Sequence, residues 1–191
     1  MPVINCWSGP RSLSTCFMYS FSKRTDCIAF DEPLYAHYLA NNPNLFRPYR
    51  EELMKSSETD GNQVIRNIYS SPTESKPLVY AKHIGKFLTN IDRKPFYSDD
   101  SLHVILIRNP LGFFFFFIDN QLKFFLKEST LNQCEDMIIS WNNKSEVHHE
   151  DCSLQGTSLP LLLELYSDIR QNTGRAPIIV DVVEHFSIMY P

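Results

Sequence analysis

The residues best suited to chemistry in this chain stand directly after its first apolar run, which spans residues 3–7. A tight turn over residues 8–10 leads into a hydroxyl-rich segment that we expect to begin a helix. That segment consists of Arg11, Ser12, Leu13, Ser14 and Thr15. The first backbone N–H groups of a helix lack partners inside it, and the helix dipole adds partial positive charge there. With the Arg11 guanidinium and the hydroxyl donors, they predict a site for a phosphate or sulfate group.

This loop differs from the one that P-loop nucleotide hydrolases use. Their motif has two glycines and a lysine directly before a Ser or Thr that binds magnesium. Here Gly9 stands alone, and no lysine precedes the hydroxyls. A magnesium-dependent nucleotide hydrolase is therefore disfavoured, and the remaining alternative is an Arg-Ser helix start that binds nothing.

Short apolar runs alternate with helical patterns along the chain. We expect strands over residues 3–7, 27–30, 78–81, 103–107 and 178–180, and helices over 13–22, 48–55, 63–69 and 161–171. This alternation indicates an α/β domain with a mainly parallel, buried sheet. Ligands of such sheets bind beyond the carboxyl ends of the strands. Polar groups follow several of these strands, namely Asp31, Glu32, Lys82, His83 and Arg108.

Composition excludes several classes of protein. The 191 residues suit one domain, and a net charge of -4 argues against a general nucleic-acid binder. The five cysteines form no CxxC pair and no signal peptide opens the chain, so we expect reduced thiols and a cytoplasmic location. The apolar run over residues 104–118 is interrupted by an Arg-Asn-Pro sequence, which argues against a membrane span.

The hydroxyl-rich loop resembles the phosphosulfate-binding loop of P-loop sulfotransferases, whose pattern is Pro-Lys/Arg-Ser-x-Ser/Thr-Thr. Residues 10–15 match it position by position. Residues 103–110 resemble the segment of that family that binds a 3′-phosphate, with Arg108 in the place of its arginine. More narrowly, residues 31–36, 47–53, 82–84 and 107–111 resemble a sulfotransferase-like group found in plants and other organisms. Some plant members carry this domain ahead of a branched-chain-aminotransferase-like domain.

The resemblance implies a three-layer P-loop domain of the sulfotransferase type. Its cofactor would be 3′-phosphoadenosine 5′-phosphosulfate (PAPS), without a metal. The implied cofactor-binding residues are Arg11, Ser12, Leu13, Ser14, Thr15 and Arg108. The implied reaction transfers a sulfuryl group to a small-molecule acceptor whose identity, like the oligomeric state, the sequence leaves open. Because no aminotransferase domain follows in this chain, pyridoxal phosphate is not expected.

Three residues are candidates for the transfer chemistry. Lys82 is expected to assist the leaving phosphate. Glu32 or His83 would remove the proton of the acceptor, and we favour Glu32, because several sulfotransferases place a glutamate at the end of the second strand. The alternatives are a carboxylate that caps a helix, a packed histidine and a solvated lysine.

The chain departs from the family after residue 111. Phe116 stands where the family has a serine that shares the 3′-phosphate, and a phenyl ring cannot donate a hydrogen bond. We interpret residues 112–158 as an inserted segment within a single domain over residues 1–191 that is incomplete at its C-terminus; a divergent helix and loop is the alternative. Two further hypotheses follow, a catalytically impaired binding module or aberrant gene product, and a small-molecule kinase of related fold.

Overall fold

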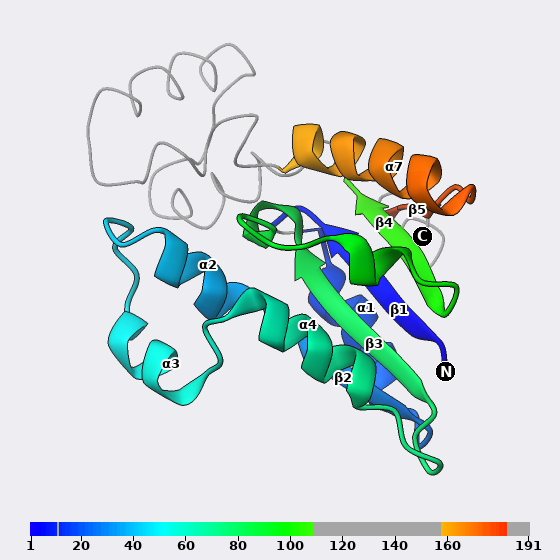
Figure 1. Ribbon diagram of the computed structural model, residues 1–191, viewed down its shortest axis with the longest axis horizontal. Helices are drawn as coiled ribbons and strands as arrows, with labels where there is room; N and C mark the ends of the chain where they lie inside the picture. Colours follow the sequence, from blue (N-terminus) through cyan, green and yellow to red (C-terminus); the bar gives the residue numbers. More distant parts are fainter. Residues whose placement is uncertain (11, 109–157, 183–191) are drawn as a thin grey trace, which may run out of the picture.

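Five parallel strands form a sheet at the centre of the structure, a computed structural model that describes residues 1–10, 12–108 and 158–182 (Figure 1). The strand order across the sheet is β2-β3-β1-β4-β5. The strands are β1 Val3–Ser8, β2 Cys27–Asp31, β3 Leu78–Ile84, β4 Ser101–Ile107 and β5 Ile178–Asp181. The expected α/β class and parallel sheet are therefore confirmed.

Helices cover both faces of this sheet, which gives three layers (Figure 1). The helices are α1 Ser14–Ser22, α2 Tyr35–Asn41, α3 Arg50–Ser56, α4 Gly61–Ser70 and α7 Leu159–Thr173, and the 3-10 turns are η1 Gly85–Phe87 and η2 Lys94–Tyr97. On one face, α1 packs its Met18 against β1 and β3. On the opposite face lie α2, α4 and α7, which bury residues such as Leu39, Ile65 and Leu165.

The two cores follow from the period of two along each strand. In β1, Val3 and Trp7 enter the larger core, while Cys6 enters the smaller core beneath α1. In β3, Tyr80 and Ala81 divide between the two cores in the same way. Because both faces are buried, the strands consist of nearly continuous apolar residues, as is typical of parallel sheets.

Two elements differ from the sequence-based expectation. The strand expected over residues 78–81 extends to Ile84, so Lys82 and His83 lie within β3 instead of after it. The helix α2 has no counterpart among the expected elements, because seven residues are too few to show a clear helical period. Within the described residues, no helix combines the length and the apolarity that a membrane crossing requires.

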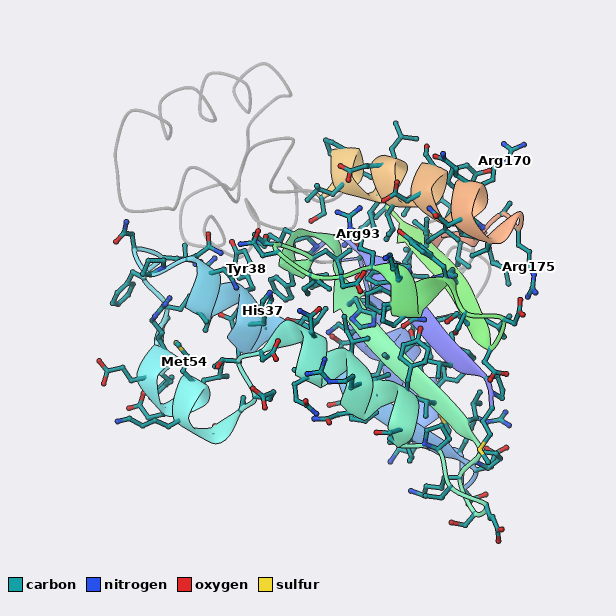
Figure 2. The ribbon with its side chains drawn as sticks, in the orientation of Figure 1. His37, Tyr38, Met54, Arg93, Arg170 and Arg175 are labelled. Carbon is teal, nitrogen blue, oxygen red and sulfur yellow. The ribbon has the colours of Figure 1, made fainter. Side chains whose placement is uncertain are left out.

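Tertiary contacts hold α2 in place. The His37 ring lies where α2 meets the start of α4, and its Nε2 lies 2.7 Å from the carbonyl of Thr89 (Figure 2). Its Nδ1 accepts a hydrogen bond from the backbone N–H of Gly61 at 3.0 Å. After the helix, Arg50 donates to the carbonyls of Asn42 and Leu45. Arg50 also donates to the carbonyl of Leu39 in the last turn of α2. These bonds tie α2 to the segments that follow it in the chain.

Two carboxylates of α7 pair with Arg93, which lies beneath that helix (Figure 2). Its Nη1 contacts Glu164 at 3.0 Å and Asp168 at 2.6 Å. The pair joins α7 to the turn that precedes β4. It also fixes the helix that covers the sheet beside the carboxyl end of β4.

Candidate functional site

The N-terminus of α1 opens at the carboxyl edge of the sheet. The helix begins at Ser14, and its N-cap residue Leu13 has a left-handed backbone with φ 55°. No side chain of the described residues caps the helix, and its first turn contains no acidic residue. By helix geometry, the backbone N–H groups of the first turn have no partners inside the helix. This end of α1 therefore offers donors and partial positive charge to an anion.

Two serines of the loop are buried against this helix start. Ser12 and Ser14 are each 5% exposed, and the Ser12 hydroxyl lies 3.5 Å from the carbonyl of Pro10. Ser8, which ends β1, is fully buried and donates to the carbonyl of His83 at 3.3 Å. The loop is thus held close to the sheet. Arg11 lies outside the described residues.

A buried lysine stands next to the helix start. The Lys82 side chain is 3% exposed, and its Nζ donates to Thr15 Oγ1 at 2.8 Å and to Asp31 Oδ1 at 2.7 Å. Nζ also lies 2.9 Å from Glu32 Oε1. Since an ammonium has three N–H donors, these three oxygens use all of them. The structure therefore brings Thr15, Glu32 and Lys82 together, as the sequence predicted for one edge of the sheet.

Burial and charge act on Lys82 in opposite directions. Burial alone lowers the pKa of a lysine, because it disfavours the charged form. The hydrogen bonds and negative charges of Asp31 and Glu32 outweigh burial and raise the pKa of Lys82 above its ordinary value. Lys82 is consequently protonated at neutral pH and supplies a full positive charge beside α1.

Glu32 adopts a backbone conformation that non-glycine residues rarely take. Its φ is 46°, in the left-handed region, which costs about 1 kcal/mol or more for an L-residue. Two backbone hydrogen bonds hold it there: its N–H donates to the carbonyl of Lys82, and its carbonyl accepts from Tyr35. This turn between β2 and α2 leaves the Glu32 side chain 32% exposed, so that the carboxylate faces both Lys82 and solvent.

His83 lies on the opposite face of β3 from Lys82, because successive side chains of a strand alternate. It is 1% exposed and stacks on Trp7 with ring centroids 4.5 Å apart. Its Nε2 lies 3.3 Å from Asn5 Oδ1, and its Nδ1 has no hydrogen-bond partner among the described residues. Burial, together with the nearby His103, lowers the pKa of His83 to about 3. The structure therefore separates His83 from the Lys82 cluster.

The buried neutral His83 makes stability depend on pH. The unfolded chain takes up a proton on this histidine below its ordinary pKa of about 6.5, whereas the folded chain does not until about pH 3. The contribution of His83 to the free energy of unfolding is therefore fully present above about pH 6.5. As the pH falls from there toward 3, this contribution decreases by about 1.4 kcal/mol per pH unit. We expect the free energy of unfolding, measured in urea at pH 7, 6 and 5, to show this decrease. In His83→Gln the free energy of unfolding should change less steeply with pH, by the slope of about 1.4 kcal/mol per pH unit that one titrating proton contributes. Equal slopes in the parent and the variant would contradict the prediction.

The remaining expected site residues are placed as follows. Arg108 comes directly after β4 and is partly buried. Residues 112–157, which include Phe116, lie outside the described residues, whereas Ser158 is described. That serine is fully buried and is the N-cap of α7, with a left-handed φ of 62°. Of the two residues that the resemblance places at a 3′-phosphate, Arg108 and Phe116, the structure therefore describes only Arg108.

Comparison with known proteins identifies the family of this chain. A family model described as a sulfotransferase domain matches residues 1–116. The chain belongs to the sulfotransferase domain family. The matched residues include the loop, the start of α1, and β1 to β4.

Two curated relatives of this sulfotransferase domain come from Arabidopsis thaliana. Branched-chain-amino-acid aminotransferase-like protein 2 is 44% identical over 113 residues, which cover 59% of this chain and 20% of that protein. Branched-chain-amino-acid aminotransferase-like protein 1 is 44% identical over 116 residues, which cover 58% and 19%. The chain thus spans about a fifth of the length of these relatives. They fit the resemblance to a plant group.

A solved structure shares the fold of this sulfotransferase domain. The sulfotransferase from Alicyclobacillus acidocaldarius aligns with a TM-score of 0.61 over 98% of this chain and 75% of that chain. The identity is 12%, so the similarity establishes the fold alone. The expected P-loop three-layer architecture is consistent with this match.

The candidate site of this sulfotransferase domain includes a contact that no sequence motif indicates, between Asp31 and Lys82. Asp31 was recognised as a polar residue after the second strand, but no role was assigned to it. In the structure its carboxylate makes the shortest contact to Lys82, because the register of β2 and β3 places the two residues opposite each other. Knowledge of the register between β2 and β3 would have indicated the contact between Asp31 and Lys82. A linear motif does not contain strand register. Among the described residues, no three His, Cys, Asp or Glu side chains gather to hold a metal ion.

Proposed function

We propose that this domain binds PAPS and transfers its sulfuryl group to an oxygen or nitrogen of a small-molecule acceptor. The observation that carries the proposal is the uncapped N-terminus of α1 beside the buried Lys82, at the carboxyl edge of a parallel sheet. Partial positive charge, unpaired N–H groups and a full cation there suit a dianionic group. Family membership supports the same reaction class.

Residues at different positions along the sheet edge would bind different parts of the cofactor. When bound, PAPS supplies the sulfuryl group and a phosphate leaving group. The N-terminal amides of α1, the Ser12 and Ser14 hydroxyls and Arg11 would bind its anionic oxygens. Lys82 would stabilise the negative charge that develops on the leaving oxygen. Arg108, after β4, would hold the 3′-phosphate through its planar guanidinium.

Glu32 is the better placed of the two expected bases. Its carboxylate is 32% exposed at the edge of the sheet, where an acceptor could approach. The 1% exposed His83 would have to leave its stacked position on Trp7 to contact an acceptor. We therefore propose that Glu32 takes the proton of the acceptor as the new bond to sulfur forms. The placement of His83 favours the packed-histidine alternative.

A calorimetric titration with adenosine 3′,5′-bisphosphate tests the binding proposal. The parent should bind, and Arg11→Ala should bind about tenfold or more weakly, since a charge-assisted hydrogen bond contributes roughly 1.5–3 kcal/mol. Arg24→Ala is the matched control, because Arg24 is exposed beyond the opposite end of α1 and pairs with Asp26. No binding by a folded parent would refute the PAPS site.

A second candidate function is a binding module of the same family without turnover. Phe116 in place of the serine expected at the 3′-phosphate favours it. Binding of the bisphosphate without sulfuryl transfer in an acceptor screen would support this alternative. If Phe116→Ser also strengthens binding, the altered position limits the cofactor site.

We also propose that the protein acts in the cytoplasm. Its cysteines include two buried free thiols, Cys6 and Cys27, and the exposed free thiol of Cys16. Thiols that stay reduced are typical of that compartment.

A further inference from the structure

The ammonium of Lys82 is saturated by oxygen atoms of the protein. Thr15, Asp31 and Glu32 each lie within 2.9 Å of Nζ, one for each N–H donor. A phosphate or sulfuryl oxygen can therefore receive a hydrogen bond from Lys82 only if one of these three acceptors leaves. The two carboxylates also place two negative charges against one positive charge. Which acceptor leaves decides how the site accepts an anion.

Asp31 is the acceptor that the fold holds most firmly. It is the last residue of β2, and the parallel register with β3 places it directly opposite Lys82. Its Oδ1 makes the shortest contact, 2.7 Å. An aspartate has one methylene between backbone and carboxyl, so a fixed backbone leaves its carboxylate little range of movement.

Glu32 is held less firmly. It lies outside the strand, in the left-handed turn that leads to α2, and its contact to Nζ is longer, 2.9 Å. Its side chain has one more rotatable bond than that of Asp31, so its carboxylate can move further from a fixed backbone. Its proposed role as a base also requires the carboxylate to turn toward an acceptor. Glu32 is consequently the partner that Lys82 can exchange.

We propose that Asp31 is a positioning residue that holds the Lys82 ammonium beside α1, while Glu32 leaves Lys82 when the cofactor binds. The N–H that Glu32 vacates passes to an anionic oxygen of the cofactor, and the same movement frees the Glu32 carboxylate for the acceptor. Arrival of the cofactor and exposure of the base are thereby coupled. This inference rests on the proposed function, because it concerns the same anion.

The first test observes Lys82 without any ligand. The ammonium groups of exposed lysines exchange rapidly with water, whereas a buried and anchored ammonium gives a ¹H–¹⁵N signal. We expect one such signal in ¹⁵N-lysine-labelled protein, assigned by its loss in Lys82→Met. It should persist in Glu32→Gln and broaden or vanish in Asp31→Asn. Absence of the signal from the parent, equal effects of the two variants, or the reverse order would overturn the proposal.

The second test uses adenosine 3′,5′-bisphosphate in calorimetry. Asp31→Asn and Glu32→Gln each remove one negative charge within hydrogen-bond distance of Lys82, so a purely electrostatic effect would be similar in both. We expect Glu32→Gln to bind at least as tightly as the parent, and Asp31→Asn to bind about tenfold more weakly than Glu32→Gln. Affinities that agree within about twofold, or the reverse order, would overturn the proposal.

The two tests separate this inference from the proposed function. If the folded parent binds no bisphosphate, the PAPS site is refuted, and the ¹H–¹⁵N signal still decides whether Asp31 anchors Lys82. If the parent binds and both variants respond alike, only the exchange of Glu32 is refuted. Both substitutions are at partly exposed side chains, 52% for Asp31 and 32% for Glu32, and unchanged melting temperatures would confirm that the fold is intact.

Discussion

Lys82→Met is expected to weaken the binding of adenosine 3′,5′-bisphosphate about 100-fold or more, which corresponds to roughly 2.7 kcal/mol. The substitution removes the full positive charge that the structure places beside the N-terminus of α1. It also leaves Asp31 and Glu32 as uncompensated negative charges next to the incoming anion. Calorimetric titration of both proteins in the same buffer and salt measures the effect.

The control for this prediction is Lys76→Met, which removes one positive charge from an exposed position before β3. Because solvent and salt screen that position, its effect on affinity should stay within about twofold. Methionine has nearly the length of lysine and fills the same buried space, so Lys82→Met should remain folded. Equal affinities of the parent and a folded Lys82→Met would show that Lys82 does not contribute to an anion site.

Trp7→Ala is expected to lower the free energy of unfolding by about 3–5 kcal/mol. The indole is fully buried, stacks on His83 and meets the edge of Phe96 with ring centroids 5.0 Å apart. Its Nε1 donates to His103 Nδ1 at 3.0 Å, which assigns the remaining proton of that ring to Nε2, 2.9 Å from the carbonyl of Phe96. Alanine would leave a cavity and an unpaired ring nitrogen.

Urea unfolding at pH 7 measures this loss, with Trp7→Phe as the comparison. Phenylalanine keeps an aromatic ring between His83 and Phe96 but removes the donor to His103, so it should cost about half as much as alanine. A change below about 1 kcal/mol in Trp7→Ala would contradict the central place of this residue in the larger core.

The sequence predicted the sheet and the strand–loop–helix order well, because local information specifies both. Buried parallel strands are short apolar runs, and all five occur where the sequence placed them, with ends shifted by a few residues. The loop over residues 8–15 carries its own donors and precedes a helical pattern. By contrast, α2 has seven residues and depends on His37 and Arg50, whose partners are distant in sequence or belong to loop carbonyls. Such a helix has no strong local signal.

The sequence by itself determined the fold class, the strand–loop–helix order and the residue types at the sheet edge. Tertiary structure decided which of these residues meet. Lys82 and His83 are neighbours in sequence, yet alternation along β3 sends one toward α1 and the other into the core beside Trp7. The pairing of Asp31 with Lys82 depends on the register between two strands that are about 50 residues apart in the chain. Register comes from the packing of whole strands, so no local motif can encode it.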